Sequence, residues 1–187
     1  DPAPGGRVMG MSVLLGKGHT LFIADTNVTE MPEAEDLVEI ALEAAQAVKA
    51  LGHTPRVAFM SYSTFGNPMG IRSEKVREAV AMLDEMDLDF EYEGEMPPAL
   101  ALEPERRGNF PFMRLTGPAN VLIMPAIHSA AISTQLVQAF GGATVIGPIL
   151  LGLEKSVQIC PLSASVSRIL HTATLAAYDQ PQQEAAL

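Results

Sequence analysis

The sequence predicts an α/β domain, a three-layer sandwich with a mainly parallel sheet, helices on both faces and a β-hairpin near one edge. Short apolar runs alternate with stretches in which apolar residues recur every three or four positions, a pattern typical of β-α-β units. Two strand-like segments near the start are instead joined by a short glycine-containing connection, which indicates a hairpin. The 187 residues, 48% of them hydrophobic and 18% charged, can bury one compact core.

The first part of the chain is predicted to form the hairpin and then a helix. Strand-like segments at 8–15 and 20–24 are joined by residues 16–19, which contain two glycines. Residues 33–51 form a helix because their apolar residues share one helical face. These apolar residues are Leu37, Ala41, Ala44, Val48 and Leu51. Gly52 is the expected C-terminal stop.

A second strand and helix follow. The apolar run 56–60 suits a buried strand, which ends in the polar cluster 61–64 and the flexible segment 66–70. Ser73 is expected to cap the next helix, and a strand is expected at 88–92. The inner face of that helix consists of Val76, Ala79, Val80 and Leu83.

The second half of the chain repeats the alternation of strands and helices after a proline-marked, charged stretch at 97–107. In order, we expect a strand at 120–124, a helix at 129–140, strands at 143–146 and 157–160, and a helix at 165–178 followed by a frayed tail from 180 to 187. Residues 1–155 are predicted to form the main domain, and residues 156–187 a strand and helix of an adjoining lobe. Because the sequence starts at Asp1 and runs almost at once into a strand, we expect a fragment of a longer polypeptide.

Composition argues against several kinds of partner. The formal net charge of -10 disfavours binding to nucleic acid or to an anionic membrane surface. No apolar stretch has the length of a membrane-spanning helix, and no basic segment precedes an apolar one at the start. Cys160 is the single cysteine, which fits a reducing compartment, so the expected location is the cytoplasm.

Polar or glycine-containing segments follow three of the predicted strands, at 61–64, 125–129 and 147–151. In a parallel sheet, ligands bind where the strands end. The hydroxyls and backbone N–H groups of the first segment can hold a phosphate or a thioester carbonyl, although a plain polar turn has the same composition. His128 can contact a ligand or act as a base, or merely cap and pack.

Other polar residues give weaker signals. His19, His53 and His171 are scattered without metal-ligand spacing, so we expect no metal site. Cys160 lies in an apolar run with no cation to activate it, which favours packing over nucleophilic chemistry. The alternating acidic residues at 91–95 are expected to form a solvated strand edge. No glycine motif of a dinucleotide fold is present, so this chain is not expected to bind NADP by itself.

Three stretches resemble the phosphate acetyl/butyryl transferase family: VAFMSYST at 57–64, GPANVLIMP at 117–125 and GATVIGPILLGL at 142–153. Further stretches resemble the subset of this family that is fused to malic enzyme, namely ADTNV at 24–28, FGNP at 65–68, FEYEGEM at 90–96, HSA at 128–130 and KSVQI at 155–159. In those proteins an N-terminal half decarboxylates malate with NADP and a divalent metal, and the appended C-terminal domain senses acetyl-CoA. The resemblance also implies a homodimer or higher homo-oligomer.

The chain departs from the pattern of active transferases where their catalysis takes place. Their serine, the arginine after it and a later aspartate correspond here to Pro161, Leu162 and Arg168. Proline has no hydroxyl, leucine cannot bind phosphate and arginine cannot act as the base, so acetyl transfer is expected to be lost. Acidic and asparagine positions after Pro125 are likewise alanines. Residues 97–99 also depart from the malic-enzyme subset, which places acetyl-CoA affinity in question.

The resemblance therefore implies a non-catalytic regulatory domain that binds acetyl-CoA, or a related acyl-CoA, as an effector and mediates oligomerisation. The expected ligand-binding residues are Ser61, Tyr62, Ser63, Thr64, Asn67, Pro125, Ile127, His128, Gly147, Pro148 and Leu151. One alternative is an active phosphate acetyltransferase that uses His128 or Ser163 as a rearranged base. Another is a purely structural dimerisation domain.

Overall fold

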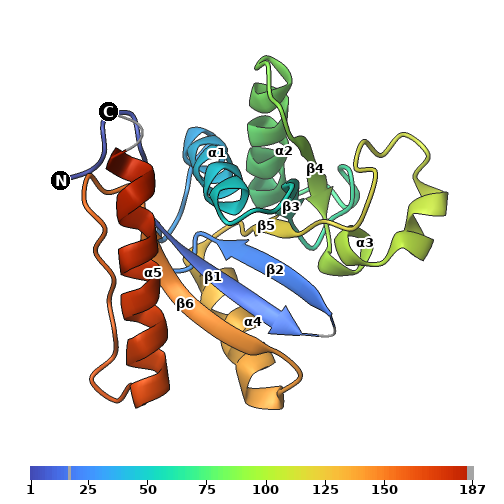
Figure 1. Ribbon diagram of the computed structural model, residues 1–187. Coiled ribbons are helices and arrows are strands. Elements are labelled where there is room, and N and C mark those ends of the chain that lie inside the picture. Colours follow the sequence, from blue (N-terminus) through green and yellow to red (C-terminus); the bar gives the residue numbers. More distant parts are fainter. Residues whose placement is uncertain (17, 185–187) are drawn as a thin grey trace.

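A computed structural model describes residues 1–16 and 18–184 of the chain. Its described part contains one six-stranded sheet in the order β4-β3-β5-β2-β1-β6 (Figure 1). The strands are β1 (Met9–Gly16), β2 (His19–Ala24), β3 (Arg56–Met60), β4 (Glu91–Met96), β5 (Val121–Ile123) and β6 (Thr144–Leu151). β1 runs antiparallel to both of its neighbours, and the other pairs are parallel. The predicted mainly parallel sheet is confirmed. The connection between β1 and β2 includes Lys17, which lies outside the described residues.

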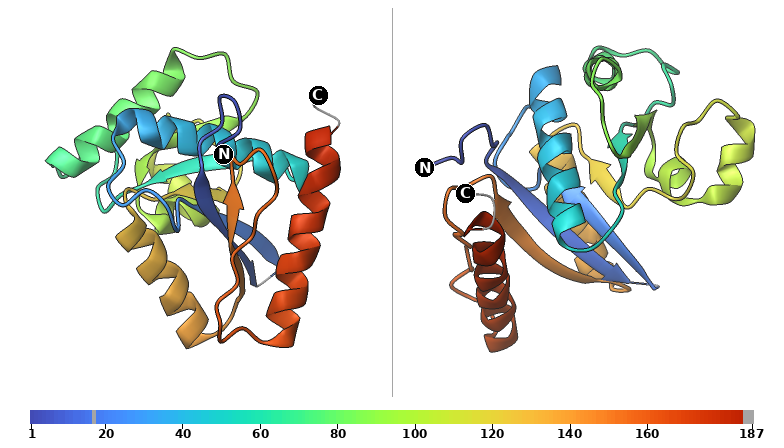
Figure 2. Two further views of the ribbon diagram at one scale, coloured as in Figure 1. Left: turned by 90° about the vertical axis from the view of Figure 1, so that its left-hand side faces the viewer. Right: turned by 45° about the horizontal axis from the view of Figure 1, so that its top comes forward.

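Helices cover both faces of this sheet (Figures 1 and 2). Against one face lie α1 (Ala34–Ala50), α2 (Ile71–Asp84) and α5 (Val166–Glu184), and against the other lie α3 (Pro98–Leu102) and α4 (Ile127–Phe140). A 3-10 helix, η1 (Pro104–Asn109), follows α3. Each layer of helices meets its own cluster of buried apolar side chains, so the predicted three-layer sandwich is confirmed.

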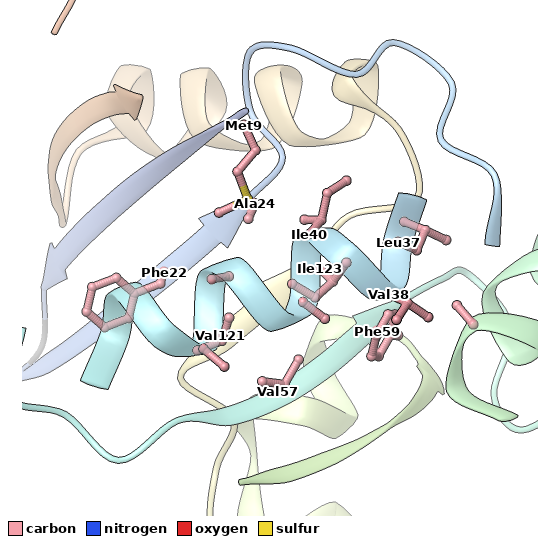
Figure 3. Packing of buried hydrophobic residues seen from close by; sticks show 14 of the residues in the cluster. Met9, Phe22, Ala24, Leu37, Val38, Ile40, Val57, Phe59, Val121 and Ile123 are labelled. Carbon is pink, nitrogen blue, oxygen red and sulfur yellow. The ribbon is translucent and has the colours of Figure 1, made fainter. Parts of the chain in front are cut away.

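The alternation of side chains along β3 shows how the two cores arise. Val57 and Phe59 belong to the cluster beneath α1 and α2, whereas Ala58 and Met60 belong to the cluster on the opposite face. Figure 3 shows the first of these clusters, in which Leu37 and Ile40 of α1 lie above the strands. A strand buried on both faces must be apolar at every position, which is why the run 56–60 predicted it correctly.

The structure shifts the start of two predicted elements. Gly70 is the N-cap of α2, so the expectation that Ser73 caps this helix is wrong. Ser73 lies within the first turn, and its hydroxyl donates to the carbonyl of Gly70 at 2.9 Å, as a back-bonding serine inside a helix does. The strand expected at 88–92 is displaced to Glu91–Met96. A strand is usually recognised from alternating apolar residues, and β4 carries carboxylates at these positions instead.

β6 is longer than predicted because Gly147 and Pro148 do not end it. The strand continues to Leu151 and pairs with β1 on both sides of these two residues. A register shift absorbs the two residues: Ile146 faces Val13, and Ile149 faces Met11. The expectation that residues 147–151 form a loop at a strand end is therefore wrong.

Residues 157–160 do not form the predicted strand. The side-chain amide of Gln158 instead donates to the carbonyl of Leu150 and accepts from its N–H, both at 3.0 Å. These two bonds satisfy the exposed edge of β6 in place of a paired strand. α5 then runs to Glu184, further than expected for a frayed tail, and residues 185–187 lie outside the described part. No helix in residues 1–16 and 18–184 combines the length and apolar character needed to span a membrane.

Candidate functional site

The carboxyl ends of β2, β3 and β5 meet at one edge of the sheet, which we call the carboxyl edge. It is formed by the segments that follow these strands, residues 25–33, 61–70 and 124–128. The backbone N–H of Ile127 donates to the carbonyl of Glu30 at 3.4 Å, so two of the segments are in contact. β3 and β5 are parallel neighbours with Phe59 opposite Ile123, so the expected ligand residues at 61–67 and 125–128 leave the sheet at the same edge.

The segment after β3 is tied down by Glu95, a fully buried residue of β4. One carboxylate oxygen, Oε1, accepts from Ser63 Oγ at 2.6 Å, Gly66 N at 3.0 Å and Arg77 Nη1 at 3.1 Å. The other oxygen, Oε2, is buried and accepts no hydrogen bond within the described residues. Ser61 Oγ lies 2.9 Å from Ser63 Oγ, which extends the network towards the edge.

The residues of this segment differ in their exposure to solvent. Tyr62 exposes 68% of its surface, whereas Ser63 is fully buried. Thr64 and Asn67 exchange backbone hydrogen bonds of 2.9 and 3.1 Å, forming a tight turn that leaves Asn67 exposed. The segment therefore presents Tyr62 and Asn67 to solvent, with Ser61 half-buried between them and the strand.

The acidic residues of β4 do not form a solvated edge, and that expectation is wrong. β4 is an edge strand, but the segment that follows η1 folds over it. Glu91 accepts from the N–H and the hydroxyl of Thr116, at 2.8 and 2.6 Å. Glu93 is buried and accepts from the N–H and guanidinium of Arg114. Each carboxylate is supplied with donors by the chain that covers it, so burial is tolerated.

Arg114 links this covering segment to β4 and to the end of α2. Its guanidinium bonds to Glu93 and to Asp84 at the end of α2, and it stacks over the ring of Tyr92 with 4.7 Å between Cζ and the ring centroid. Burial raises the pKa of the Asp84 carboxyl, but hydrogen bonds from Arg114 and Tyr92 outweigh it and hold this pKa below its usual value. This network is structural: it attaches the covering segment to β4.

Asp25 is a third buried carboxylate, on another strand end, that sequence reasoning missed. Its Oδ1 accepts from the backbone N–H groups of Gly10, Asn27 and Val28 at 2.8, 2.9 and 3.1 Å, and its Oδ2 from that of Thr29 at 2.7 Å. These bonds fix the segment that leaves β2. The signal available in the sequence was an aspartate directly after a strand and before polar residues, which is typical of an Asx-type turn.

His128 is exposed at the start of α4, at the carboxyl edge. Its Nε2 lies 3.7 Å from Glu30 Oε1, and both side chains are about three-quarters exposed. Among the described residues, no group of three or more His, Cys, Asp or Glu side chains could hold a metal ion. His53 packs against Phe22 with 5.4 Å between ring centroids, away from any ligand cluster.

Of the residues at the expected transferase positions, Arg168 contacts β6, and none belongs to the segments of the carboxyl edge. Arg168 Nη2 donates to the carbonyl of Gly147, in the middle of β6, at 2.8 Å. Pro161 and Leu162 lie in the exposed segment before α5. Because three strands separate β3 from β6, neighbouring strands being about 4.8 Å apart, the two are roughly 19 Å from each other. Gly147, Pro148 and Leu151 of β6 are likewise remote from Ser61.

An apolar cavity of about 60 Å³ lies between α1, β6 and α5. Its lining includes Met11, Ala47, Leu51, Ile149, Leu175 and Tyr178. Leu151 also lines it, but the other expected ligand residues do not. A space of this size holds no more than a few water molecules.

Comparison with known proteins places these features in a family. A model of the family described as "Phosphate acetyl/butaryl transferase" matches residues 1–177. The chain is 55% identical over 179 residues to the NADP-dependent malic enzyme of Rhizobium meliloti (strain 1021), covering 96% of this chain and 24% of that protein. It is 34% identical over 172 residues to the phosphate acetyltransferase of Nitratidesulfovibrio vulgaris, covering 91% of this chain and 24% of that protein. The chain thus spans about a quarter of the length of these relatives.

Solved structures show the same fold. A phosphotransacetylase from Streptococcus pyogenes superposes with a TM-score of 0.91 at 28% identity, covering 97% of this chain and 56% of that one. The EutD phosphotransacetylase from Staphylococcus aureus gives a TM-score of 0.87 at 26% identity, covering 95% of this chain and 56% of that one. The expected resemblance to the phosphotransacetylase-like domain of malic enzymes is confirmed, and the chain belongs to the phosphate acetyl/butaryl transferase family.

Proposed function

We propose that the chain is a catalytically inactive regulatory domain of an NADP-dependent malic enzyme, and that it binds acetyl-CoA at the carboxyl edge. The observation that carries the loss of catalysis is the state of the expected transferase positions. Pro161 and Leu162 offer no acid or base, and the Arg168 guanidinium is bound to the carbonyl of Gly147. Malate oxidation, with its NADP and divalent metal, belongs to the rest of the longer protein in this proposal, and the location is the cytoplasm.

Acetyl-CoA binding is supported by what the carboxyl edge retains. Tyr62 is an exposed aromatic side chain, which can pack against an apolar or planar part of a ligand. Ser61, Asn67 and His128 add polar groups to the segments that form the same edge. Binding there would favour one arrangement of the catalytic half over another, and so regulate it.

Exposed apolar side chains support the proposal that the domain also mediates oligomerisation. They occur on α4, in the segment before α5 and on α5 itself, where apolar surface faces water. These residues are Ile132, Leu136, Phe140, Val157, Ile159, Leu162, Val166, Ile169 and Leu170. Covering this surface with a second copy would remove it from water.

An active phosphate acetyltransferase is the second candidate. The similarity to the phosphate acetyltransferase of N. vulgaris favours it, and His128 is an exposed imidazole at the carboxyl edge that is available as a base. Such an enzyme would transfer the acetyl group of acetyl-CoA to phosphate, releasing CoA and acetyl phosphate.

Calorimetric titration with acetyl-CoA, beside a thiol assay with acetyl phosphate and CoA, separates these functions. We expect binding without turnover, and we expect Tyr62→Ala to weaken binding about 5- to 10-fold because it removes an aromatic contact. Tyr178→Ala is the matched control, since it removes a half-exposed aromatic side chain on α5, away from the carboxyl edge. Turnover would overturn the proposed inactivity. No binding at millimolar acetyl-CoA would leave a structural domain.

A further inference from the structure

The hydrogen bonds between Glu95, Ser63 and Ser61 can run in one direction only. We infer that Ser61 presents a hydrogen-bond acceptor to the ligand, and that it therefore receives an N–H or O–H donor of the pantetheine arm, not a phosphate of acyl-CoA. This inference rests on the proposed acetyl-CoA site and specifies which part of the ligand lies there.

Glu95 sets the direction because its Oε1 is surrounded by obligatory donors. The backbone N–H of Gly66 and the guanidinium of Arg77 both donate to it, at 3.0 and 3.1 Å, and neither group can accept. A carboxylate oxygen that already receives two such donors must be an acceptor towards its third partner, Ser63 Oγ. The Ser63 hydroxyl hydrogen is therefore directed at Glu95, over a contact of 2.6 Å.

Ser63 has one hydroxyl hydrogen, so it cannot also donate to Ser61. The 2.9 Å contact between the two hydroxyl oxygens thus requires Ser61 to donate to Ser63. The backbone N–H of Ser63 in turn donates to Ser61 Oγ at 3.3 Å. After these bonds, Ser61 Oγ retains only a lone pair for an additional partner.

The free lone pair of Ser61 Oγ favours a ligand group that donates a hydrogen bond and disfavours a group that carries only acceptors. Phosphate oxygens at neutral pH are acceptors, so a phosphate against Ser61 Oγ would be repelled. The pantetheine arm of acyl-CoA carries two amide N–H groups and a hydroxyl, all uncharged donors. Because Ser61 is half-buried and directly follows the apolar strand β3, an uncharged donor is also cheaper to desolvate there than an anion.

Two fragments of the ligand test this assignment. S-acetylpantetheine contains the arm alone, and adenosine 3′,5′-bisphosphate contains two of the phosphates together with the remaining donors of the coenzyme, the adenine amine and the ribose 2′-hydroxyl. We expect Ser61→Ala to weaken acetyl-CoA and S-acetylpantetheine about 3- to 10-fold in calorimetric titrations, and to leave adenosine bisphosphate unchanged. Ser167→Ala, an exposed serine on α5, should change none of the three affinities.

A second variant tests the direction itself. Ser63→Ala removes the acceptor to which Ser61 is bound and frees the Ser61 hydroxyl to donate outward. We therefore expect inorganic sulfate, which carries only acceptors at neutral pH, to compete with acetyl-CoA in Ser63→Ala at concentrations that leave the wild-type affinity unchanged. Equal competition in both proteins would overturn the inference. So would a Ser61→Ala effect confined to adenosine bisphosphate, or no effect on either fragment, while absence of acetyl-CoA binding in the wild type would overturn the proposed function itself.

Discussion

Arg77→Ala should lower the free energy of unfolding by about 3 kcal/mol, because it leaves a buried negative charge without a cationic partner. Glu95 is fully buried and has Arg77 as its cationic partner, 3.1 Å away, while Oε2 already lacks a hydrogen bond within the described residues. Ser63 and Gly66 would remain as donors but carry no charge. Urea unfolding, followed by circular dichroism, measures the change.

Lys75→Ala is the matched control on the same helix. Lys75 pairs with Glu33 at 2.8 Å, but the Glu33 side chain is 67% exposed, so removing this pair should cost less than about 1 kcal/mol. If the two variants are equally stable, the buried carboxylate does not depend on its arginine.

Combining Arg77→Ala with Glu95→Gln should restore part of the lost stability. The glutamine side chain keeps an acceptor for Ser63 and Gly66 but removes the unpaired charge. We expect the double variant to be more stable than Arg77→Ala alone by about 1 kcal/mol, because contacting residues are not additive. A double variant less stable than Arg77→Ala would contradict this account of the site.

The positions of the buried strands could be predicted from sequence because burial on both faces leaves a local signature. β3 and β5 are continuous apolar runs, and α1 shows its inner face at regular spacing. The carboxyl ends of parallel strands lie at the same edge of a sheet, so the sequence also predicted that Ser61 and His128 lie at one edge. These predictions needed no knowledge of which strands are neighbours.

The carboxylates of β4 could not be placed in this way. Whether Glu95 is solvated or buried depends on Arg77 and Gly66, which lie 18 and 29 residues away along the chain. An acidic strand has the same composition whether its donors are water or protein groups. Only the fold shows whether water or protein groups donate hydrogen bonds to these carboxylates.

The error at β6 has a related cause. Gly147 and Pro148 are the usual residues of a turn, but a register shift against β1 accommodates them within the ladder. The order of the strands then places β6 at the far side of the sheet from β3. Residues that follow similar strand patterns in the sequence thus need not share a site.

Asp25→Ala should be the most destabilising substitution that we predict, at about 4 kcal/mol. Asp25 is 3% exposed, and its two oxygens accept from the backbone N–H groups of Gly10, Asn27, Val28 and Thr29. Alanine leaves four donors without their partner, of which that of Gly10 is buried and the others are part-buried, and each unsatisfied buried donor costs about 1 to 3 kcal/mol before relaxation. Urea unfolding again provides the measurement.

Asp25→Asn tests whether the two oxygens contribute separately. Its amide oxygen can replace Oδ1, which receives three of the donors, but its NH₂ group would face the N–H of Thr29, where Oδ2 now accepts at 2.7 Å. We therefore expect a loss of about 2 kcal/mol, between the wild type and Asp25→Ala. Asp87→Ala, at an exposed aspartate after α2, should leave the unfolding curve unchanged. Because the segment from Asp25 leads to Glu30, whose carbonyl accepts from Ile127, both Asp25 variants should also weaken acetyl-CoA binding, and unchanged affinity would separate this segment from the site.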